Sequence, residues 1–388
     1  MKQRRDLYLV AASLLTWGAG EGLFYIFQPL YLQELGADPV LIGTILGING
    51  FGMALAQIPA GYLSDRIGRR PLMWFTWIMG VIAAVIMASA QGLTAFVIGL
   101  VLYGLTSAAL APMNSYVAQA RGDWSVGRAL SFTSAAYNVG ATLGPLTGGL
   151  IAERFGLRSV YIVASGFFVI STLILLFIRK QPVENMEVHE KSPSLLKNPR
   201  FVLSLGMILM IMFALYLPQP LTSNFLQNER GLSLAAIGRL GSIQNIGNVI
   251  FLLVLGHLPP MTAFMLGQVA LMGFSALLWK GSGMFSYGLG YLLLGGYRLS
   301  RSLSSAFVRP VVGDAQVGLA FGFVEAANNL AYLAAPVLAG LIYDRNPESV
   351  YPVSLIILLV SLCLTFVVNR HRSAIKNHLS EHSSTMME

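Results

Sequence analysis

Charged residues and cysteine are scarce in this sequence. Asp, Glu, Lys and Arg make up only 11% of its 388 residues, whereas 55% are hydrophobic and the mean hydropathy is +0.67. A water-facing surface needs about twice that charged fraction, so a soluble globular protein is excluded. The single cysteine, Cys363, lies in an apolar run, which excludes an intramolecular disulfide and disfavours thiolate chemistry. We therefore expect an integral membrane protein.

The sequence also lacks the motifs of enzymes and of nucleotide or metal sites. It has no Gly-x-x-x-x-Gly-Lys loop to hold phosphates, so ATP is not expected as the energy source. No Ser/His/Asp set or metal cluster can be assembled at one depth of the membrane. The net charge of +8 comes from basic residues at the ends of apolar runs, where anionic headgroups and topology account for them. We expect no enzyme, no cofactor, no metal and no nucleic-acid partner, and a lipid bilayer as the surroundings.

Twelve apolar runs are long enough to cross a bilayer, which takes about 20 residues in a helix. Helices are expected because the runs lack the strict alternation of membrane strands. The predicted spans are 7–32, 39–63, 72–91, 93–119, 128–152, 158–179, 200–227, 234–257, 261–279, 283–307, 319–342 and 350–369. With the N-terminus in the cytoplasm, 17 Lys and Arg lie on the inner side and five on the outer side. This asymmetry predicts that both termini are cytoplasmic and that the protein lies in the cytoplasmic (plasma) membrane.

The chain reads as a duplicated unit. Shifted by 191 residues, the stretch 122–154 aligns with 313–345 without a gap and with fourteen identities, Pro145 and Pro336 among them. This indicates two six-helix halves, and the polar stretch 180–199 between them marks the boundary. The predicted domains are an N-terminal six-helix bundle at 1–179, a cytoplasmic linker at 180–199, a C-terminal six-helix bundle at 200–374 and a cytoplasmic tail at 375–388.

A charge-dense turn separates the second and third predicted spans. It places four ionised groups within six residues, which cannot lie in hydrocarbon, and its glycine permits a bend with positive φ. The pattern, G-x-L-x-D-R-x-G-R-R, resembles the loop between helices 2 and 3 of the major facilitator superfamily of secondary transporters. The resemblance implies an all-α membrane protein with twelve transmembrane helices in two pseudo-symmetric bundles. It also implies a conformational latch, whereas a plain cytoplasmic stop signal is the alternative. The latch residues are Gly61, Asp65, Arg66, Gly68, Arg69 and Arg70.

A second motif lies in the fifth predicted span. It resembles the fifth-helix motif of the antiporters of this superfamily, which are proton-coupled exporters. Physically, it supplies small residues for close helix packing and a proline for a kink, so plain helix packing is the alternative interpretation. The motif residues are Gly140, Gly144, Pro145, Gly148 and Gly149.

Four ionisable residues stand out inside the predicted spans, where charge is costly and therefore indicates function. Glu21 lies near the middle of the first span, where loss of water favours the neutral acid and lets it load and release protons. A structural salt bridge is the alternative for Glu21. Arg298 and Arg301 lie one turn apart in the tenth span, and Glu325 lies in the eleventh at a depth close to that of Arg301. Glu21 and Glu325 are the candidate proton-coupling residues, with a structural Arg301–Glu325 ion pair as the alternative for Glu325.

The resemblance implies that spans 1, 4, 7 and 10 line a central cavity. Glu21 shares a helical stripe with aromatic and amide side chains of its own span. Arg298 would hold an anionic or hydroxyl group of the substrate, or act as the counter-charge of Glu21. Polar side chains in spans also serve as hydrogen-bonding contacts between helices, which is the alternative for each one. The candidate substrate-binding residues are Trp17, Glu21, Tyr25, Gln28, Tyr103, Asn114, Gln219, Tyr291, Arg298 and Arg301.

Together these observations favour a carrier. We expect two bundles that rock about a midplane site and move a small-molecule substrate, with protons as the coupling ion. Aromatic cavity stripes and the fifth-helix motif favour export of amphipathic compounds, and we expect a monomer. Leu100 stands where the family's fourth-helix motif has an arginine, so a proton relay through that arginine is not available. The alternatives are proton-coupled transport of a sugar-like or anionic metabolite and, in another class, a non-transporting membrane receptor.

Overall fold

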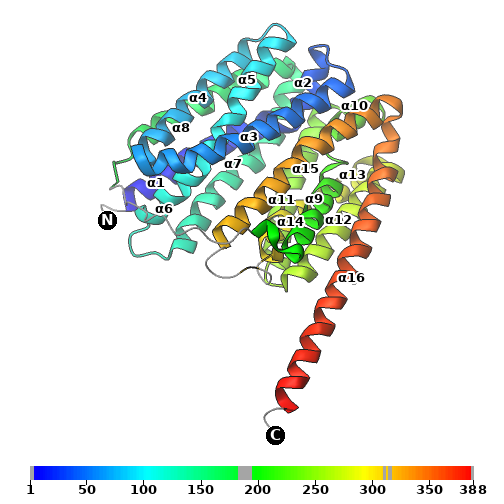
Figure 1. Ribbon diagram of the computed structural model, residues 1–388. Helices are drawn as coiled ribbons and strands as arrows, with labels where there is room; N and C mark the ends of the chain where they lie inside the picture. The colour runs from blue at the N-terminus through cyan, green and yellow to red at the C-terminus, as the bar shows by residue number, and fades with distance from the viewer. Residues whose placement is uncertain (1–3, 182–194, 309–311, 313–316, 386–388) are drawn as a thin grey trace. The chain divides into compact units, whose positions relative to one another are not determined.

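Every regular element in the described part of the chain is helical. The computed structural model describes residues 4–181, 195–308, 312 and 317–385, and no strand occurs among them (Figure 1). Ten helical stretches of these residues are long and apolar enough to cross a membrane. The other two predicted spans, 128–152 and 283–307, are helical as well. The predicted all-α fold is confirmed.

The helix bounds follow the predicted spans closely. The helices are α1 (Arg4–Phe24), α2 (Gln28–Glu34), α3 (Pro39–Ile67), α4 (Arg69–Ser89), α5 (Leu93–Leu105), α6 (Leu110–Ala120), α7 (Val126–Phe155), α8 (Leu157–Leu176), α9 (Pro199–Tyr216), α10 (Thr222–Asn228), α11 (Leu234–Leu255), α12 (Pro260–Lys280), α13 (Gly283–Leu293), α14 (Gly295–Val308), α15 (Val317–Arg345) and α16 (Val350–Thr385). Short 3₁₀ turns lie at Tyr25–Phe27, Thr106–Ala109, Leu195–Lys197 and Pro347–Ser349.

Contacts between Cα atoms divide the chain into two compact units. Unit 1 comprises Met1–Lys191, Gln219–Ile246 and Tyr332–Pro347, and unit 2 comprises Ser192–Pro218, Gly247–Ala331 and Glu348–Glu388. The predicted division into bundles at 1–179 and 200–374 stays a prediction. Residues 182–194 of the predicted linker and 386–388 of the predicted tail lie outside the described residues.

In unit 1, α1 packs against α7 and α8. Glycines make the contact between α1 and α7 very close: a Cβ atom on Gly144 would lie 2.5 Å from the Cα atom of Gly22, and one on Gly140 would collide with the carbonyl oxygen of Leu15. Small residues are the usual means by which membrane helices approach closely. The close packing given as the alternative interpretation of the fifth-helix motif is present, whereas the antiporter role of Gly140, Gly144, Pro145, Gly148 and Gly149 stays a prediction. We call this contact the α1–α7 glycine seam.

The opposite side of α1 packs against α4 and α8 through rings and hydroxyls. The Trp17 ring centroid lies 4.9 Å from that of Trp77 and 4.5 Å from that of Phe168. Next to them, the indole N–H of Trp77 donates to the hydroxyls of Ser13 and Ser171, at 2.9 and 3.0 Å. All of these side chains are buried. The polar atoms satisfy one another, which a buried group needs in a region without water.

The duplication seen in the sequence reappears in the packing. The helices α7 and α15 contain 30 and 29 residues, and each has a proline inside it, Pro145 and Pro336. A Cβ atom on Gly238 of α11 would collide with the carbonyl oxygen of Pro145. Correspondingly, a Cβ atom on Gly43 of α3 would collide with the carbonyl oxygen of Pro336. Both contacts lie within unit 1, so the two copies of the repeat use the same proline in the same way.

A cluster of amide side chains joins α2 to α10, also within unit 1. The Nδ2 atom of Asn224 donates to the Oε1 atom of Gln33 at 2.6 Å, and that of Asn228 donates to the same oxygen at 3.0 Å. Asn224 also donates to the backbone carbonyl of Pro29 at 3.1 Å. The hydroxyl of Ser223 donates to the carbonyl of Ile26 at 2.8 Å. We call this group the α2–α10 amide cluster.

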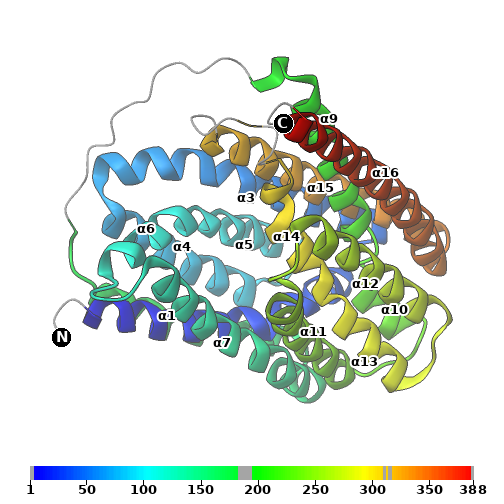
Figure 2. The same ribbon diagram turned by 90° about the horizontal axis from the view of Figure 1, so that it is seen from below.

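In unit 2, α12 packs against α13, α14 and α16 (Figure 2). The buried side chain of Gln268 on α12 donates to the hydroxyl of Thr365 at 3.2 Å and accepts from that of Ser361 at 2.9 Å. A Cβ atom on Gly267 would collide with the hydroxyl of Ser300, so α12 and α14 are also in close contact. Buried hydrogen bonds and small residues therefore hold this unit together as they do the first.

Candidate functional site

Four of the twelve predicted spans are not one continuous α-helix. The breaks lie at Tyr25–Phe27 in span 1, at Thr106–Ala109 in span 4, at 217–221 in span 7 and at Leu294 in span 10. Each of the other eight predicted spans is one continuous helix over the described residues. The breaks in spans 1 and 4 are tighter 3₁₀ turns, so the chain stays helical through them. The four interrupted spans are those that the sequence resemblance predicts to line the cavity.

Glu21 lies one turn before the break in span 1, surrounded by tyrosines of unit 1. The hydroxyl of Tyr137 on α7 donates to the Oε2 atom of Glu21 at 2.9 Å. Tyr25 and Tyr103 interact electrostatically with the Glu21 carboxyl group, and Tyr332 lies beside Tyr25. We call Glu21 with these four tyrosines the Glu21 site. It combines a partly exposed acid with hydroxyls that can both donate and accept hydrogen bonds.

The α1–α7 glycine seam brings Tyr137 to Glu21. A Cβ atom on Gly18 would collide with the backbone carbonyl of Tyr137, so α7 approaches α1 here as closely as two helices can. Gly18 lies one turn before Glu21, and the seam continues past it to Gly22. Any larger residue in the seam would separate the two helices. The small residues therefore fix the distance between the acid and its hydrogen-bond donor.

The predicted substrate-binding residues of unit 1 fall into two groups. Trp17 is only 7% exposed and packs in the ring cluster of α1, α4 and α8, and Gln28 and Tyr103 are buried as well. Tyr25, by contrast, is 51% exposed beside Glu21, and Asn114 is exposed on α6. The structure thus brings Tyr25 and Tyr103 to Glu21. The binding roles of all these residues stay predictions.

In unit 2, the second intramembrane acid lies in a hydrogen-bonded network. The Nη2 atom of Arg301 lies 3.3 Å from the Oε2 atom of Glu325, so the ion pair foreseen as the alternative role of Glu325 is present. The Nδ2 atom of Asn328 donates to the Oε1 atom of Glu325 at 3.3 Å and to the hydroxyl of Ser304 at 3.2 Å. The side chains of Arg301 and Glu325 are 33% and 46% exposed. The proton-coupling role of Glu325 stays a prediction.

The remaining predicted binding residues are divided between the units. Arg298 is exposed on α14, one turn before Arg301. Tyr291 is 2% exposed, and its ring packs edge-on against Phe274 with centroids 5.9 Å apart, inside unit 2. Gln219 belongs to unit 1 and is partly buried. The expected position of Arg298 opposite Glu21 stays a prediction.

Sequence reasoning did not single out Tyr137, although a signal for it exists. Tyr137 and Asn328 occupy equivalent positions of the repeat, 191 residues apart. Each donates a hydrogen bond to the intramembrane acid that the structure describes nearby, Glu21 and Glu325. Both copies of this repeat position carry a polar residue, although the helices around them are rich in small residues. Such a pair of polar residues can therefore indicate which side chain donates a hydrogen bond to an intramembrane acid.

Proline accounts for two of the four breaks. Pro29 lies at the start of α2, and Pro218 and Pro220 lie between α9 and α10, as expected for residues that interrupt a helix. The breaks at Thr106–Ala109 and at Leu294 contain no proline. Proline alone was therefore an incomplete guide.

The charged turn between α3 and α4 has the geometry that its sequence predicts. Gly68 has a φ of 88°, which confirms the expected bend. The Nη1 atom of Arg69 donates to the Oε1 atom of Gln119 on α6 at 2.8 Å, and the guanidinium of Arg70 lies 3.8 Å from the ring centroid of Trp74. The side chain of Asp65 lies outside what the structure describes. The latch role of Gly61, Asp65, Arg66, Gly68, Arg69 and Arg70 stays a prediction.

Long apolar helices that pack through small residues and buried hydrogen-bonded polar groups define a multi-pass membrane protein. The model of the Major Facilitator Superfamily matches residues 9–300. The chain belongs to this superfamily, whose members are carriers and not enzymes, and which act on small molecules at the membrane.

Curated relatives and solved structures agree with this assignment. The multidrug resistance protein MdtG of Salmonella arizonae is 35% identical over 213 residues, and MdtG of Salmonella paratyphi A is equally similar. The match spans about half of each chain, 52% of this one and 52% of the relative. The nucleoside transporter NupG superposes with a TM-score of 0.77 at 16% identity, covering 95% of this chain and 98% of that chain. The human organic anion transporter MFSD10 gives a TM-score of 0.67 at 16% identity, covering 94% and 100%. These two structures share the fold.

Proposed function

We propose that this carrier exports amphipathic compounds in exchange for protons, and that Glu21 is the coupling acid. One observation carries the proposal: a carboxyl group inside the apolar stretch Arg4–Glu34, one turn before the 3₁₀ turn at Tyr25–Phe27, accepts a hydrogen bond from the hydroxyl of Tyr137 at 2.9 Å. Acids in membrane spans face a cavity or an internal partner and commonly form part of proton pathways. The name of the curated relatives, multidrug resistance protein, supports export of drug-like compounds.

Competition for Glu21 couples the two fluxes. As a carboxylate, Glu21 accepts the hydrogen bond of Tyr137 and attracts a donor or cationic group of the substrate. A proton that enters from the outer side neutralises the acid, removes that attraction and displaces the substrate. The aromatic ring of Tyr25, which is exposed beside Glu21, offers apolar contact to an amphipathic molecule at the same place. Proton and substrate then cannot occupy Glu21 together, which is the requirement for exchange.

Flux measurements in proteoliposomes test this proposal. The Glu21→Gln variant keeps the size and polarity of the side chain but cannot exchange a proton. We expect an imposed pH gradient to drive an amphipathic fluorescent dye across the membrane with wild type and not with Glu21→Gln. Glu34→Gln is the matched control, because Glu34 lies in the same span but is exposed at the end of α2. Equal responses of wild type and Glu21→Gln to the gradient would contradict coupling through Glu21.

Transport of an anionic metabolite is a second candidate, favoured by the exposed Arg298 on α14. A guanidinium group binds carboxylates and phosphates through two parallel hydrogen bonds. If this candidate holds, an organic anion competes with the dye, and Arg298→Gln abolishes the competition while dye transport persists. An absence of competition would leave export of amphipathic compounds as the function.

We also propose that the protein works as a monomer in the cytoplasmic membrane, with both termini on the inner side. The orientation is supported by the distribution of Lys and Arg, with 17 on the inner side and five on the outer side of the predicted spans. Two reporters fused to the C-terminus test the orientation, one active only in the cytoplasm and one active only outside it. We expect only the first to be active.

A further inference from the structure

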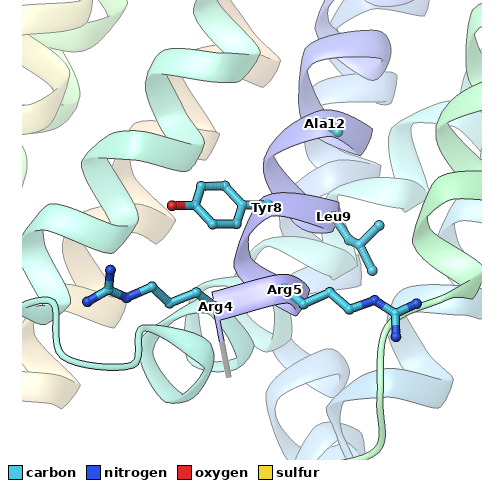
Figure 3. A pocket seen from close by; sticks show the side chains of 5 residues that line it. All are labelled: Arg4, Arg5, Tyr8, Leu9 and Ala12. Atoms are coloured by element: carbon cyan, nitrogen blue, oxygen red, sulfur yellow. The ribbon is translucent and has the colours of Figure 1, made fainter. Parts of the chain in front are cut away.

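A hollow of about 630 Å³ opens beside the first three turns of α1, far from the Glu21 site. It is lined by Arg4, Arg5, Tyr8, Leu9 and Ala12 (Figure 3). Its volume is within the range of about 300–1,000 Å³ typical of small-molecule sites. Sixteen residues separate Arg5 from Glu21, which is about 24 Å along a helix. The hollow is therefore not part of the proposed coupling site.

The charge at the hollow is positive. Arg4 forms an ion pair with Asp123, its Nη2 atom 2.7 Å from the Oδ2 atom, but the Asp123 side chain is 89% exposed and largely in water. Arg5 is exposed and has no ion-pair partner among the residues that the structure describes. Asp6, the neighbouring acid, is 8% exposed and interacts with Tyr116, so it does not line the hollow. One arginine is thus available for an anion and a second is only partly neutralised.

Aromatic rings stand next to these arginines. The Tyr8 ring packs edge-on against Phe132, with centroids 5.7 Å apart, and Phe132 packs in the same way against Trp124 at 5.5 Å. The guanidinium of Arg4 lies 5.7 Å from the Trp124 ring, and that of Arg128 lies 4.4 Å from it. Tyrosine, tryptophan and arginine together are typical of the boundary between hydrocarbon and headgroups.

We propose that this hollow binds the phosphate of an anionic phospholipid headgroup. Figure 3 shows the Arg5 side chain on one side of α1, with Leu9, and the Arg4 and Tyr8 side chains on the other. The Arg5 guanidinium therefore supplies the forked donors that match a phosphate, and Arg4 adds positive charge at the opposite rim. The apolar wall of Leu9 and Ala12 suits the glycerol and the first carbons of an acyl chain, which a free phosphate ion lacks. The position at the end of the first membrane span places the site at the headgroup level. A lipid therefore fits both the charged and the apolar parts of the hollow.

Lipid binding to the full-length protein tests the proposal. The purified protein is titrated with phosphatidylglycerol or with zwitterionic phosphatidylethanolamine, and bound lipid is counted by native mass spectrometry. We expect wild type to prefer phosphatidylglycerol, and Arg5→Gln to weaken its binding about five-fold, the effect of one arginine near an anionic headgroup. Arg5→Lys keeps the positive charge but loses the forked guanidinium donors. We expect its affinity for phosphatidylglycerol to lie between that of wild type and that of Arg5→Gln. Because Arg5 is exposed, its replacement is not expected to disturb folding, and a thermal unfolding curve checks this.

Arg154→Gln is the matched control. Arg154 is also exposed, and its guanidinium lies 5.3 Å from the ring centroid of Phe155. It lies at the C-terminal end of α7, whereas Arg128 and Phe132 near the hollow lie at the N-terminal end. We expect it to leave phosphatidylglycerol binding unchanged. Equal binding of the two lipids, or an equal loss in Arg5→Gln and Arg154→Gln, would overturn the proposal. Displacement of the lipid by millimolar inorganic phosphate would also overturn it, because a free anion would then be the occupant.

Discussion

Glu21 and Glu325 are both acids inside membrane spans, but their described surroundings differ. The hydrogen bond that the structure shows at Glu21 comes from a tyrosine hydroxyl, and two further tyrosines interact with it. Glu325 is paired with Arg301 and bonded to Asn328. A hydroxyl can donate to a carboxylate and accept from a carboxylic acid, whereas a guanidinium can only donate. The tyrosine hydroxyls can form hydrogen bonds with Glu21 whether it is charged or neutral. Arg301 stabilises Glu325 only when Glu325 is charged.

The two acids nevertheless accept hydrogen bonds from residues at equivalent positions of the repeat. Tyr137 and Asn328 are equivalent residues of α7 and α15, and each donates to the acid of its own surroundings. The acids themselves are not equivalent, since Glu21 lies on α1 and Glu325 lies on α15. The two halves therefore share the position of the hydrogen-bond donor but not that of the acid. Four substitutions test this comparison.

The largest effect is expected for Glu21→Gln. Transport driven by a pH gradient should fall to the level of liposomes without protein, because the amide cannot take up or release a proton. Exchange of labelled for unlabelled substrate without a gradient should weaken as well, because the uncharged amide lacks the attraction of the carboxylate for the substrate. A persistent response to the gradient would show that another group couples protons, and Glu325 would be the first to examine.

Tyr137→Phe should come next. It removes the hydroxyl that donates to Glu21 but keeps the ring in the seam. A hydrogen bond to a charged group contributes about 1.5–3 kcal/mol, so we expect gradient-driven transport to fall about ten-fold or more, without being abolished. Initial transport rates at several pH values provide the measurement. Tyr161→Phe is the control, because it removes a buried tyrosine hydroxyl of unit 1 that makes no hydrogen bond to Glu21.

Gly144→Ala tests whether the glycine seam holds Tyr137 in place. The added methyl group would collide with the backbone of Gly22, and overpacking of this kind costs about 1–3 kcal/mol. We expect the midpoint of unfolding in a denaturing detergent to fall and gradient-driven transport to weaken with it. Gly166→Ala is the control on α8, where a Cβ atom would meet nothing within 4 Å. If both variants were equally stable, the seam would not be tightly packed.

The smallest effect is expected for Glu325→Gln. Its pair with Arg301 is partly exposed, and pairs of that kind contribute about 0–1 kcal/mol to stability. With a structural role alone, transport and its pH dependence should stay within about two-fold of wild type, an effect size typical of a lost partly exposed ion pair. A loss of coupling as large as that of Glu21→Gln would instead make Glu325 a second proton-coupling residue. The assay is the same flux measurement, run beside Glu21→Gln.

The sequence predicted the spans well and the site only in outline. Span positions follow from the length of apolar runs, and the bend at Gly68 follows from a glycine between charged residues, so both were accessible. Glu21 was accessible because a lone acid in an apolar run is costly. The approach of Tyr137 was not, since it depends on the angle and distance at which α7 crosses α1. The buried state of Trp17 was missed for a related reason: a stripe on one helix does not reveal which neighbour covers it.

The amide cluster between α2 and α10 has a different physical character from the glycine seam. Its hydrogen bonds join amide side chains that, once separated, would bond to water with little net change in free energy. Glycines packed backbone to backbone have no such replacement, because lipid cannot fill the space they leave. Within unit 1, separating the amide side chains therefore costs less free energy than separating the two helices at the glycine seam.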